Sequence, residues 1–306
     1  MSREVHVAHM EAPAGGRTIS NLVKLLRPHQ WAKNAFVIAP LLFAREAHHP
    51  SQLARAFAAA LLFSLAASAV YCINDVLDAP RDRMHPRKRL RPVASGAVSE
   101  RVAILLGISL ALLAVVGGAL LSTPFMHILA IYLALNLLYT IRLKDVVLLD
   151  VLIISISFVL RVLAGAAAIN VPASHWLLLC TLLLALYLAF SKRRAELRLL
   201  GDGSAGHRPS LVGYTPELLD RFGAILLGAT IVAYALYTVS PETIAKFGSD
   251  RLIYGLPFVI YGLFRYLLIV EAGGDSGEPG ALALKDVPLV VCVLLWIAFN
   301  AAMIYG

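Results

Sequence analysis

Long apolar stretches separated by short polar segments dominate the chain from residue 32 to its end. A helix needs roughly 20 predominantly apolar residues to cross the hydrocarbon core of a bilayer. By this rule the pattern predicts an all-α, polytopic membrane protein with nine transmembrane helices arranged as a bundle. Pro40 and Arg45 interrupt the first of them. The predicted spans are 32–47, 53–73, 102–121, 124–141, 147–169, 174–191, 222–240, 251–270 and 286–305.

The N-terminal segment differs from the rest of the chain. Residues 1–20 contain no apolar run and include Pro13 and the paired Gly15 and Gly16. They lack the apolar centre of a cleavable signal peptide. We therefore predict a disordered cytoplasmic tail over residues 1–20 and a single transmembrane domain over residues 21–306.

Composition agrees with the hydropathy pattern. Hydrophobic residues make up 59% of the 306 residues and charged residues 15%, and the mean hydropathy is +0.76. A soluble domain of ordinary composition is excluded. The formal net charge of +8 could suggest nucleic acid, but the basic residues lie in short loops between apolar runs, where membrane orientation and anionic ligands explain them. We therefore expect no nucleic-acid partner.

The distribution of Lys and Arg predicts how the chain is oriented. Of these 27 residues, 21 fall on the side that holds the N-terminus and 4 on the opposite side. Basic loops face the cytoplasm in multi-pass proteins, so the N-terminus is predicted to be cytoplasmic, in a plasma (inner) membrane. The two longest loops, 74–101 and 191–221, lie on that side and are rich in charged residues. Candidate functional residues are expected there.

An acidic motif closes the second predicted span. Asn74 is followed by Asp75, Asp78 and Asp82. At about 100° per residue, the three carboxylates lie within about 60° of one another on a continuous helix, although Pro80 could end that helix before Asp82. Carboxylates at a membrane surface need neutralising, and such oxygen ligands suit Mg²⁺ carrying part of a diphosphate. A solvated turn paired with the following basic residues would give the same pattern.

Basic and polar residues accompany this motif at several predicted span ends. Arg89 and Arg91 follow the acidic face and can grip phosphate in a bidentate manner, although orientation alone would also explain much of the basic run. Arg161 lies inside the fifth span, and an arginine at that depth is a candidate functional residue. Asp150 shares its face but lies about 16 Å away along the axis. Further candidates at span ends are Lys33, Asn34, Tyr139, Arg142 and Lys144.

The motif N-D-x-x-D-x-x-x-D at residues 74–82 resembles the first aspartate-rich motif of the UbiA-type intramembrane prenyltransferase superfamily. Three further segments are similar to its decaprenyl-phosphate phosphoribosyltransferase branch. They are residues 27–34 (RPHQWAKN), 68–75 (SAVYCIND) and 192–197 (KRRAEL). The resemblance covers nearly the whole chain.

The resemblance implies a function that the second long loop supports. Typical members of the superfamily carry a second aspartate-rich motif there, whereas this chain has Lys192, Arg193, Arg194 and Glu196. Phosphoribosyl pyrophosphate brings a 5-phosphate besides its diphosphate, and a lipid phosphate acceptor brings another anion, so cations are needed. The implied reaction is Mg²⁺-dependent transfer of 5-phosphoribosyl to a polyprenyl (decaprenyl) phosphate, with release of pyrophosphate, for synthesis of an arabinose-type cell-envelope sugar donor.

The resemblance also implies roles for individual residues. Glu196, together with the three aspartates, would be catalytic, binding a ribose hydroxyl or the metal. The Mg²⁺ ligands would be Asn74, Asp75, Asp78 and Asp82. The phosphates of the two substrates would be lined by Lys33, Asn34, Arg89, Arg91, Tyr139, Arg142, Lys144, Arg161, Lys192 and Arg193.

Two alternative functions stay open at this point. One keeps the fold and moves a prenyl group from a prenyl diphosphate to an aromatic acceptor, although the second acidic motif is missing. The other is a lipid or small-molecule transporter, which predicts charges near the membrane midplane in related halves of the chain; here the charges concentrate at one surface. Residues 192–194 could also serve only as a basic anchor at a helix end. A homo-oligomer is compatible with the sequence.

Overall fold

The computed structural model describes residues 14–84, 86, 88–200, 209–272 and 282–306, and every regular element within them is a helix. The all-α prediction is therefore confirmed. Five are short 3₁₀ helices: η1 (Pro28–Asn34), η2 (Lys88–Leu90), η3 (Leu143–Asp145), η5 (Pro209–Gly213) and η6 (Arg251–Gly255). The α-helices are α1 (Ala14–Leu26), α2 (Ala35–Phe43), α3 (Pro50–Arg83), α4 (Glu100–Leu121), α5 (Thr123–Ile141), α6 (Leu149–Ala168), α7 (His175–Leu200), α9 (Pro216–Val239), α10 (Pro241–Phe247), α11 (Leu256–Ala272) and α13 (Val287–Tyr305).

Eight helices in the described part of the chain are long and apolar enough to cross a membrane, and the protein is an integral membrane protein. They are α3, α4, α5, α6, α7, α9, η6 with α11, and α13. The first predicted span is not one continuous helix, because it is divided between η1 and the nine-residue α2. These two pieces run antiparallel to α3, since Trp31 bonds to Ser68 and Asn34 to Ser64. The nine-helix prediction thus becomes eight continuous helices and one broken segment.

Part of the predicted N-terminal tail is helical. Helix α1 begins at Ala14, so residues 14–20 are helical, whereas residues 1–13 lie outside the described residues. Leu22, Leu25 and Leu26 pack against α3, where Leu25 is fully buried beside Cys72 and Ala79. These leucines cover one face of α1, and the helix itself is too short to cross a membrane.

Several helices begin with a side-chain cap, which explains where the chain turns. Thr215 accepts a hydrogen bond from the amide of Leu218 at the start of α9, and Ser99 accepts one from Val102 at the start of α4. Such caps satisfy amide groups that have no partner within the helix. Prolines in the first turn, such as Pro216, need no amide hydrogen there.

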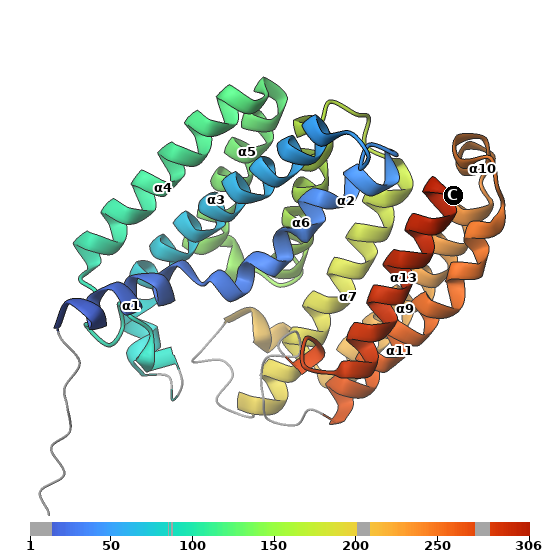
Figure 1. Ribbon diagram of the computed structural model, residues 1–306. Helices are drawn as coiled ribbons and strands as arrows, with labels where there is room; N and C mark the ends of the chain where they lie inside the picture. Colours follow the sequence, from blue (N-terminus) through green and yellow to red (C-terminus); the bar gives the residue numbers. More distant parts are fainter. Residues whose placement is uncertain (1–13, 85, 87, 201–208, 273–281) are drawn as a thin grey trace, which may run out of the picture.

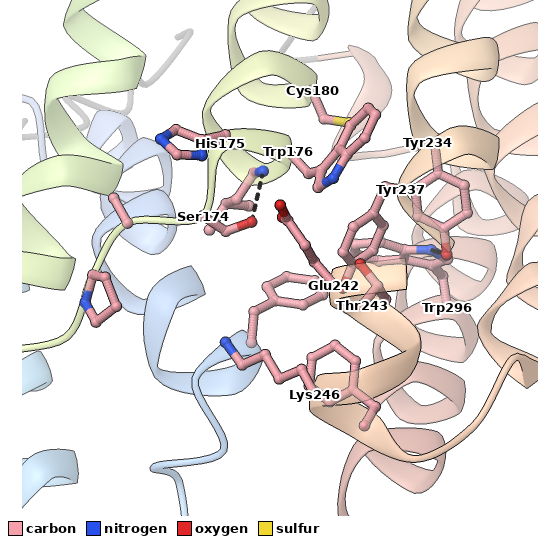
Figure 2. Close-up of a pocket in the computed structure, with 15 residues that line it drawn as sticks. Ser174, His175, Trp176, Cys180, Tyr234, Tyr237, Glu242, Thr243, Lys246 and Trp296 are labelled. Carbon is pink, nitrogen blue, oxygen red and sulfur yellow. Dashed lines mark hydrogen bonds between the residues drawn. The ribbon is translucent and has the colours of Figure 1, made fainter. Parts of the chain in front are cut away.

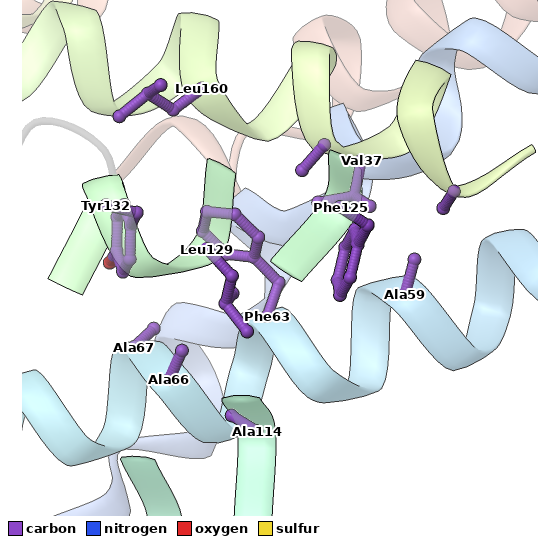
Figure 3. Packing of buried hydrophobic residues seen from close by; sticks show 12 residues of the cluster. Val37, Ala59, Phe63, Ala66, Ala67, Ala114, Phe125, Leu129, Tyr132 and Leu160 are labelled. Carbon is purple, nitrogen blue, oxygen red and sulfur yellow. The ribbon is translucent and has the colours of Figure 1, made fainter. Parts of the chain in front are cut away.

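Small side chains hold the first half of the bundle together. Ala59, Ala66 and Ala67 of α3 lie in one buried cluster with Phe63 of the same helix and with Phe125, Leu129 and Tyr132 of α5 (Figure 3). The cluster fills the space between α3, α5 and α6. Small residues allow helices to approach closely in a membrane, where lipid is as apolar as leucine. The closest approach joins α6 to α2, because a Cβ built on Gly165 would lie 1.9 Å from the carbonyl oxygen of Val37.

The helices alternate in direction, so the loops divide between two ends of the bundle. The end of α3 and the end of α7 lie on the lower side of Figure 1, whereas the start of α3 and the short helix α10 lie on the upper side. The α5–α6 connection is also on the lower side, since Lys144 in it reaches Asp78 near the end of α3. The predicted charged loops therefore share one end of the bundle.

Candidate active site

The three carboxylates of the acidic motif lie on one continuous helix. Helix α3 passes through Pro80 and ends at Arg83, so Pro80 does not separate Asp82 from the other two. Asp75 and Asp82 are buried, at 1% and 4% exposure, and the Asp78 side chain is 27% exposed. The predicted acidic face is therefore formed, with Asp78 as its most accessible member.

Each carboxylate of this face contacts a basic side chain. Arg27 donates to Asp75, Lys144 donates to Asp78, and Arg91 lies 2.6 Å from Asp82 and 3.6 Å from Asp75. Buried carboxylates require such partners, because removal from water is costly for a charged group. Arg91 is thus in the predicted place, whereas Arg89 lies exposed on η2 without contributing to these ion pairs.

The acidic face retains capacity for a cation. Oδ2 of Asp75 is buried and has no hydrogen-bond partner among the residues that the structure describes, and the amide oxygen of Asn74 accepts a hydrogen bond from Thr140. These are hard oxygen donors of the kind that suit Mg²⁺. Within the described residues, no three His, Cys, Asp or Glu side chains are gathered around one point, because the carboxylates face basic groups. These oxygen atoms fit Mg²⁺, and a bound ion would replace part of the contacts between the carboxylates and their basic partners.

The contact between Thr140 and Asn74 leads to a first prediction. Thr140→Val keeps the shape of the buried side chain and removes the hydroxyl that donates to Asn74. We expect about a tenfold rise in the Mg²⁺ concentration needed for half-maximal activity, as is typical when a group that orients a metal ligand is lost. Titration of activity with Mg²⁺ measures this. The matched control is Thr230→Val, whose hydroxyl donates only within α9, to the carbonyl of Leu226; an equal shift in that variant would contradict the assignment.

The end of α7 meets the start of α6 near the acidic face. Arg193 is 1% exposed; its Nε lies 2.9 Å from Asp150, and it also donates to Glu196. Asp150 follows the loop whose Lys144 contacts Asp78, so the two charged clusters meet through this loop. Tyr139 interacts electrostatically with Arg193. Lys192 and Arg142 are exposed at the same end of the bundle.

Asn34 and Arg161 lie deeper in the bundle than the acidic face. Lys33 is exposed on η1. Nε of Arg161 donates to Asn34 at 2.8 Å, and Asn34 donates to Ser64 of α3. Ser64 precedes Asp75 by three helical turns, about 16 Å toward the membrane interior.

The surroundings of Arg161 are aromatic. The guanidinium carbon lies 5.0 to 5.2 Å from the ring centres of Phe63, Tyr132 and Phe158, and the residue is 4% exposed. Cation–π contacts stabilise a desolvated guanidinium. Arg161 therefore has partners on neighbouring helices, Asn34 and Tyr132, and on its own helix. Asp150 pairs with Arg193 instead. Direct contact of Arg161 with a substrate stays a prediction.

Four residues of these clusters were not recognised as candidates from the sequence. Arg27 pairs with Asp75 and stacks on Tyr71, with 5.0 Å between the guanidinium carbon and the ring centre. Arg27 lies in the segment RPHQWAKN, which was noted only as a similarity. The other three are Thr140, Asp150 and Tyr214, whose hydroxyl donates to Asp150. No sequence signal distinguished them, because their partners lie far away along the chain.

The described residues also enclose a cavity of about 310 Å³ at the opposite end of the bundle. Aromatic side chains of α7, α9 and α13, including Trp176, Tyr237 and Trp296, line it beside Glu242 and Lys246 of α10 (Figure 2). None of the predicted site residues lines this cavity. It is therefore separate from the charged clusters.

The protein is an all-helical membrane protein whose buried acids, surrounding bases and oxygen donors lie together at one end of the bundle. Comparison with known proteins supplies the family. The sequence model of the UbiA prenyltransferase family matches residues 35–283, and the chain belongs to this family.

Individual relatives agree with this membership. The chain is 35% identical to the decaprenyl-phosphate phosphoribosyltransferase of Mycolicibacterium smegmatis, covering 98% of both chains. It is 34% identical to the protein of the same name from Mycobacterium tuberculosis H37Rv, covering 94% of this chain and 96% of the relative. A UbiA homologue from Archaeoglobus fulgidus, solved with DMAPP and Mg²⁺, superposes with a TM-score of 0.70 at 22% identity over 93% of this chain and 99% of that one. This last similarity supports the fold.

Proposed function

We propose that this protein transfers the 5-phosphoribosyl group of phosphoribosyl pyrophosphate to a polyprenyl phosphate, with Mg²⁺, releasing pyrophosphate. The observation that carries the proposal is the basic segment at the end of α7, where Lys192, Arg193 and Arg194 stand in place of a second set of carboxylates. Lys192 is exposed there, whereas Arg193 pairs with Asp150 and Arg194 with Asp220. A substrate pair with several phosphates requires more cations than a prenyl diphosphate does. The names of the full-length relatives support the same reaction.

In this proposal the acidic face of α3 holds the metal. Asn74, Asp75, Asp78 and Asp82 supply oxygen atoms, and the buried Oδ2 of Asp75 is the donor that lacks a partner among the described residues. When bound, Mg²⁺ would neutralise charge that grows on the departing pyrophosphate. Arg27 and Arg91 hold the buried carboxylates in place through ion pairs.

The basic residues around this face would hold the phosphates. Lys144 and Lys192, from the α5–α6 loop and from α7, lie at the same end of the bundle as Asp78. Lys33, Arg89 and Tyr139 complete the proposed set, and Arg142 is an exposed neighbour. Holding both substrates in a fixed orientation supplies much of the rate enhancement in a displacement of this kind.

The chemical step requires little proton transfer from the protein. A phosphate monoester has a second pKa near 6 and is already anionic at pH 7. An oxygen of the lipid phosphate attacks the anomeric carbon, the bond to pyrophosphate breaks, and the configuration inverts from α to β. Glu196 accepts hydrogen bonds from ribose hydroxyls in this arrangement. No general base is needed beside the acidic motif.

The location of the site follows from the orientation of the bundle. Because the basic loops face the cytoplasm, the proposal places the N-terminus and the site on the cytoplasmic side of the plasma membrane, where a water-soluble donor is available. Residues 21–306 would form the single catalytic domain. The product would serve as a precursor of a cell-envelope arabinose donor. A homo-oligomer stays a prediction.

A donor comparison tests the proposed function. Purified protein is incubated with Mg²⁺ and polyprenyl phosphate, together with either phosphoribosyl pyrophosphate or a prenyl diphosphate with an aromatic acceptor, and the lipid products are identified by mass spectrometry. We expect a phosphoribosylated lipid from the first mixture and no prenylated product from the second. A prenylated aromatic product alone would replace the proposal with the family's other reaction.

Lys192 provides a second prediction. Its exposed ammonium group at the end of α7 is proposed to contact the 5-phosphate. Lys192→Ala should therefore raise the KM for phosphoribosyl pyrophosphate by on the order of tenfold, because one charge-assisted hydrogen bond is lost. The matched control is Lys285→Ala, an exposed lysine at the same end of the bundle, before α13. An equal rise in KM for both variants would indicate a general charge effect.

A further inference from the structure

Arg193 has surroundings that do not suit a phosphate contact. Its guanidinium is 1% exposed and lies between two carboxylates, with Nε 2.9 Å from Oδ2 of Asp150 and Nη1 donating to Glu196. Two carboxylates and one guanidinium carry a net charge of −1. That charge repels a phosphate, and the guanidinium is already paired with two acids of the protein.

Asp150 is fixed from a second direction. It is fully buried; the hydroxyl of Tyr214 donates to its Oδ1 at 2.7 Å, and the hydroxyl of Ser210 donates to its Oδ2 at 3.2 Å. Burial and the bond to Asp150 raise the pKa of Tyr214 well above its ordinary value, so the phenol stays protonated and donates. A buried carboxylate that accepts from two hydroxyls and forms an ion pair with a guanidinium has little freedom to move.

Tyr214 also holds the loop that carries Lys144. Its hydroxyl accepts a hydrogen bond of 2.8 Å from the amide of Leu148, whose φ of 68° is unusual for a leucine. Strained backbone persists only where surrounding contacts enforce it. One buried cluster therefore fixes both the loop beside Asp78 and the end of α7.

We infer that Asp150, acting through Arg193, positions Glu196 to bind the hydroxyl groups of the donor's ribose, and that Arg193 is a positioning residue. The Glu196 side chain is 19% exposed and is the outermost member of the series Tyr214, Asp150, Arg193 and Glu196. A carboxylate held in one orientation discriminates strongly for a hydroxyl-bearing ligand. The ribose assignment rests on the proposed function, whereas the positioning of Glu196 by Asp150 does not.

A double-mutant cycle tests this inference. Asp150→Asn, Glu196→Gln and the double variant are purified, and kcat and KM for phosphoribosyl pyrophosphate are measured. Each single variant should lower kcat/KM by about tenfold to a hundredfold, as for groups that orient a functional residue. The double variant should lose no more than Glu196→Gln alone, because Asp150 acts through Glu196. Losses that multiply would overturn the inference.

Milder variants guard against a folding defect. Tyr214→Phe removes one of the hydroxyl groups that donate to Asp150. It should lower kcat/KM when it is the only substitution, but not when it is combined with Glu196→Gln. Tyr266→Phe, a buried tyrosine of α11 in another cluster, is the matched control, and thermal unfolding in detergent is recorded for every variant. If Tyr214→Phe loses the same factor in both backgrounds, the positioning role is wrong.

The wild-type protein separates the two proposals. If it makes a lipid product only from a prenyl diphosphate, the proposed function and the ribose assignment fail. The same cycle is then measured with that donor. Coupling between Asp150 and Glu196 would still support the positioning role, and independent losses would refute it.

Discussion

Asp78→Asn should reduce turnover by on the order of a thousandfold while the protein is still produced and folded. Asp78 is the most accessible of the three aspartates and contacts Lys144. The amide retains the size of the side chain but removes the charge that contacts Lys144 and that the proposed function assigns to Mg²⁺ binding. The loss of a preorganised electrostatic contact has an effect of that magnitude. Initial rates at saturating Mg²⁺ measure the loss.

A carboxylate outside the proposed site serves as the control for Asp78. Glu100 begins α4 at the same end of the bundle and lies 3.5 Å from Arg83 in an exposed pair. Exposed pairs contribute little to stability, so Glu100→Gln should retain nearly full activity. Wild-type rates in Asp78→Asn would remove the acidic face from the site, and an equal loss in Glu100→Gln would indicate a general effect of surface charge.

Gly165→Ala should destabilise the fold strongly. The new methyl group would lie 1.9 Å from the carbonyl oxygen of Val37, and the backbones of α6 and α2 would have to separate. Overpacking against backbone costs on the order of 3 kcal/mol or more. We expect the midpoint of thermal unfolding in detergent to fall by on the order of 5 °C. Activity should fall as well, because α2 continues from the segment that carries Lys33 and Asn34.

Gly228 in α9 is the matched control for Gly165. A Cβ built there meets no atom within 4 Å, and alanine is a better helix former than glycine by about 1 kcal/mol. Gly228→Ala should therefore leave the unfolding midpoint unchanged or raise it. Equal stability of the two variants would mean that α2 and α6 are not in the tight contact described.

The long spans could be predicted from the sequence because bilayer thickness fixes a length that an apolar run either reaches or does not. Helices that are broken or too short to cross the bilayer could not be predicted in the same way. The segment from Pro28 to Phe43 is broken into η1 and α2, and its place in the bundle depends on contacts with α3 such as Trp31 to Ser68. Helix α1 is too short to register as a span and is held by its leucines.

The acidic face was also predictable, because three aspartates at helical spacing lie on one side whatever surrounds them. The burial of Arg193 was not predictable, because its partner Asp150 lies on α6. The hydroxyls of Ser210 and Tyr214 that support Asp150 come from the chain after α7. Arg27 is a comparable case, because only the packing of η1 against α3 brings it to Asp75. Periodicity reports which residues share a helix face, and tertiary packing decides which faces meet.

The most direct measurement of the central claim compares how phosphoribosyl pyrophosphate and inorganic pyrophosphate bind. Titration calorimetry with and without Mg²⁺ is carried out on wild-type protein, Asp78→Asn and Lys192→Ala. If the carboxylates of α3 and Lys192 of α7 hold the same molecule of phosphoribosyl pyrophosphate, the binding of both ligands should require Mg²⁺ and Asp78. Phosphoribosyl pyrophosphate should bind more tightly than pyrophosphate to the wild type, and Lys192→Ala should remove that difference. Binding that needs no Mg²⁺, or an undiminished preference in Lys192→Ala, would contradict the account.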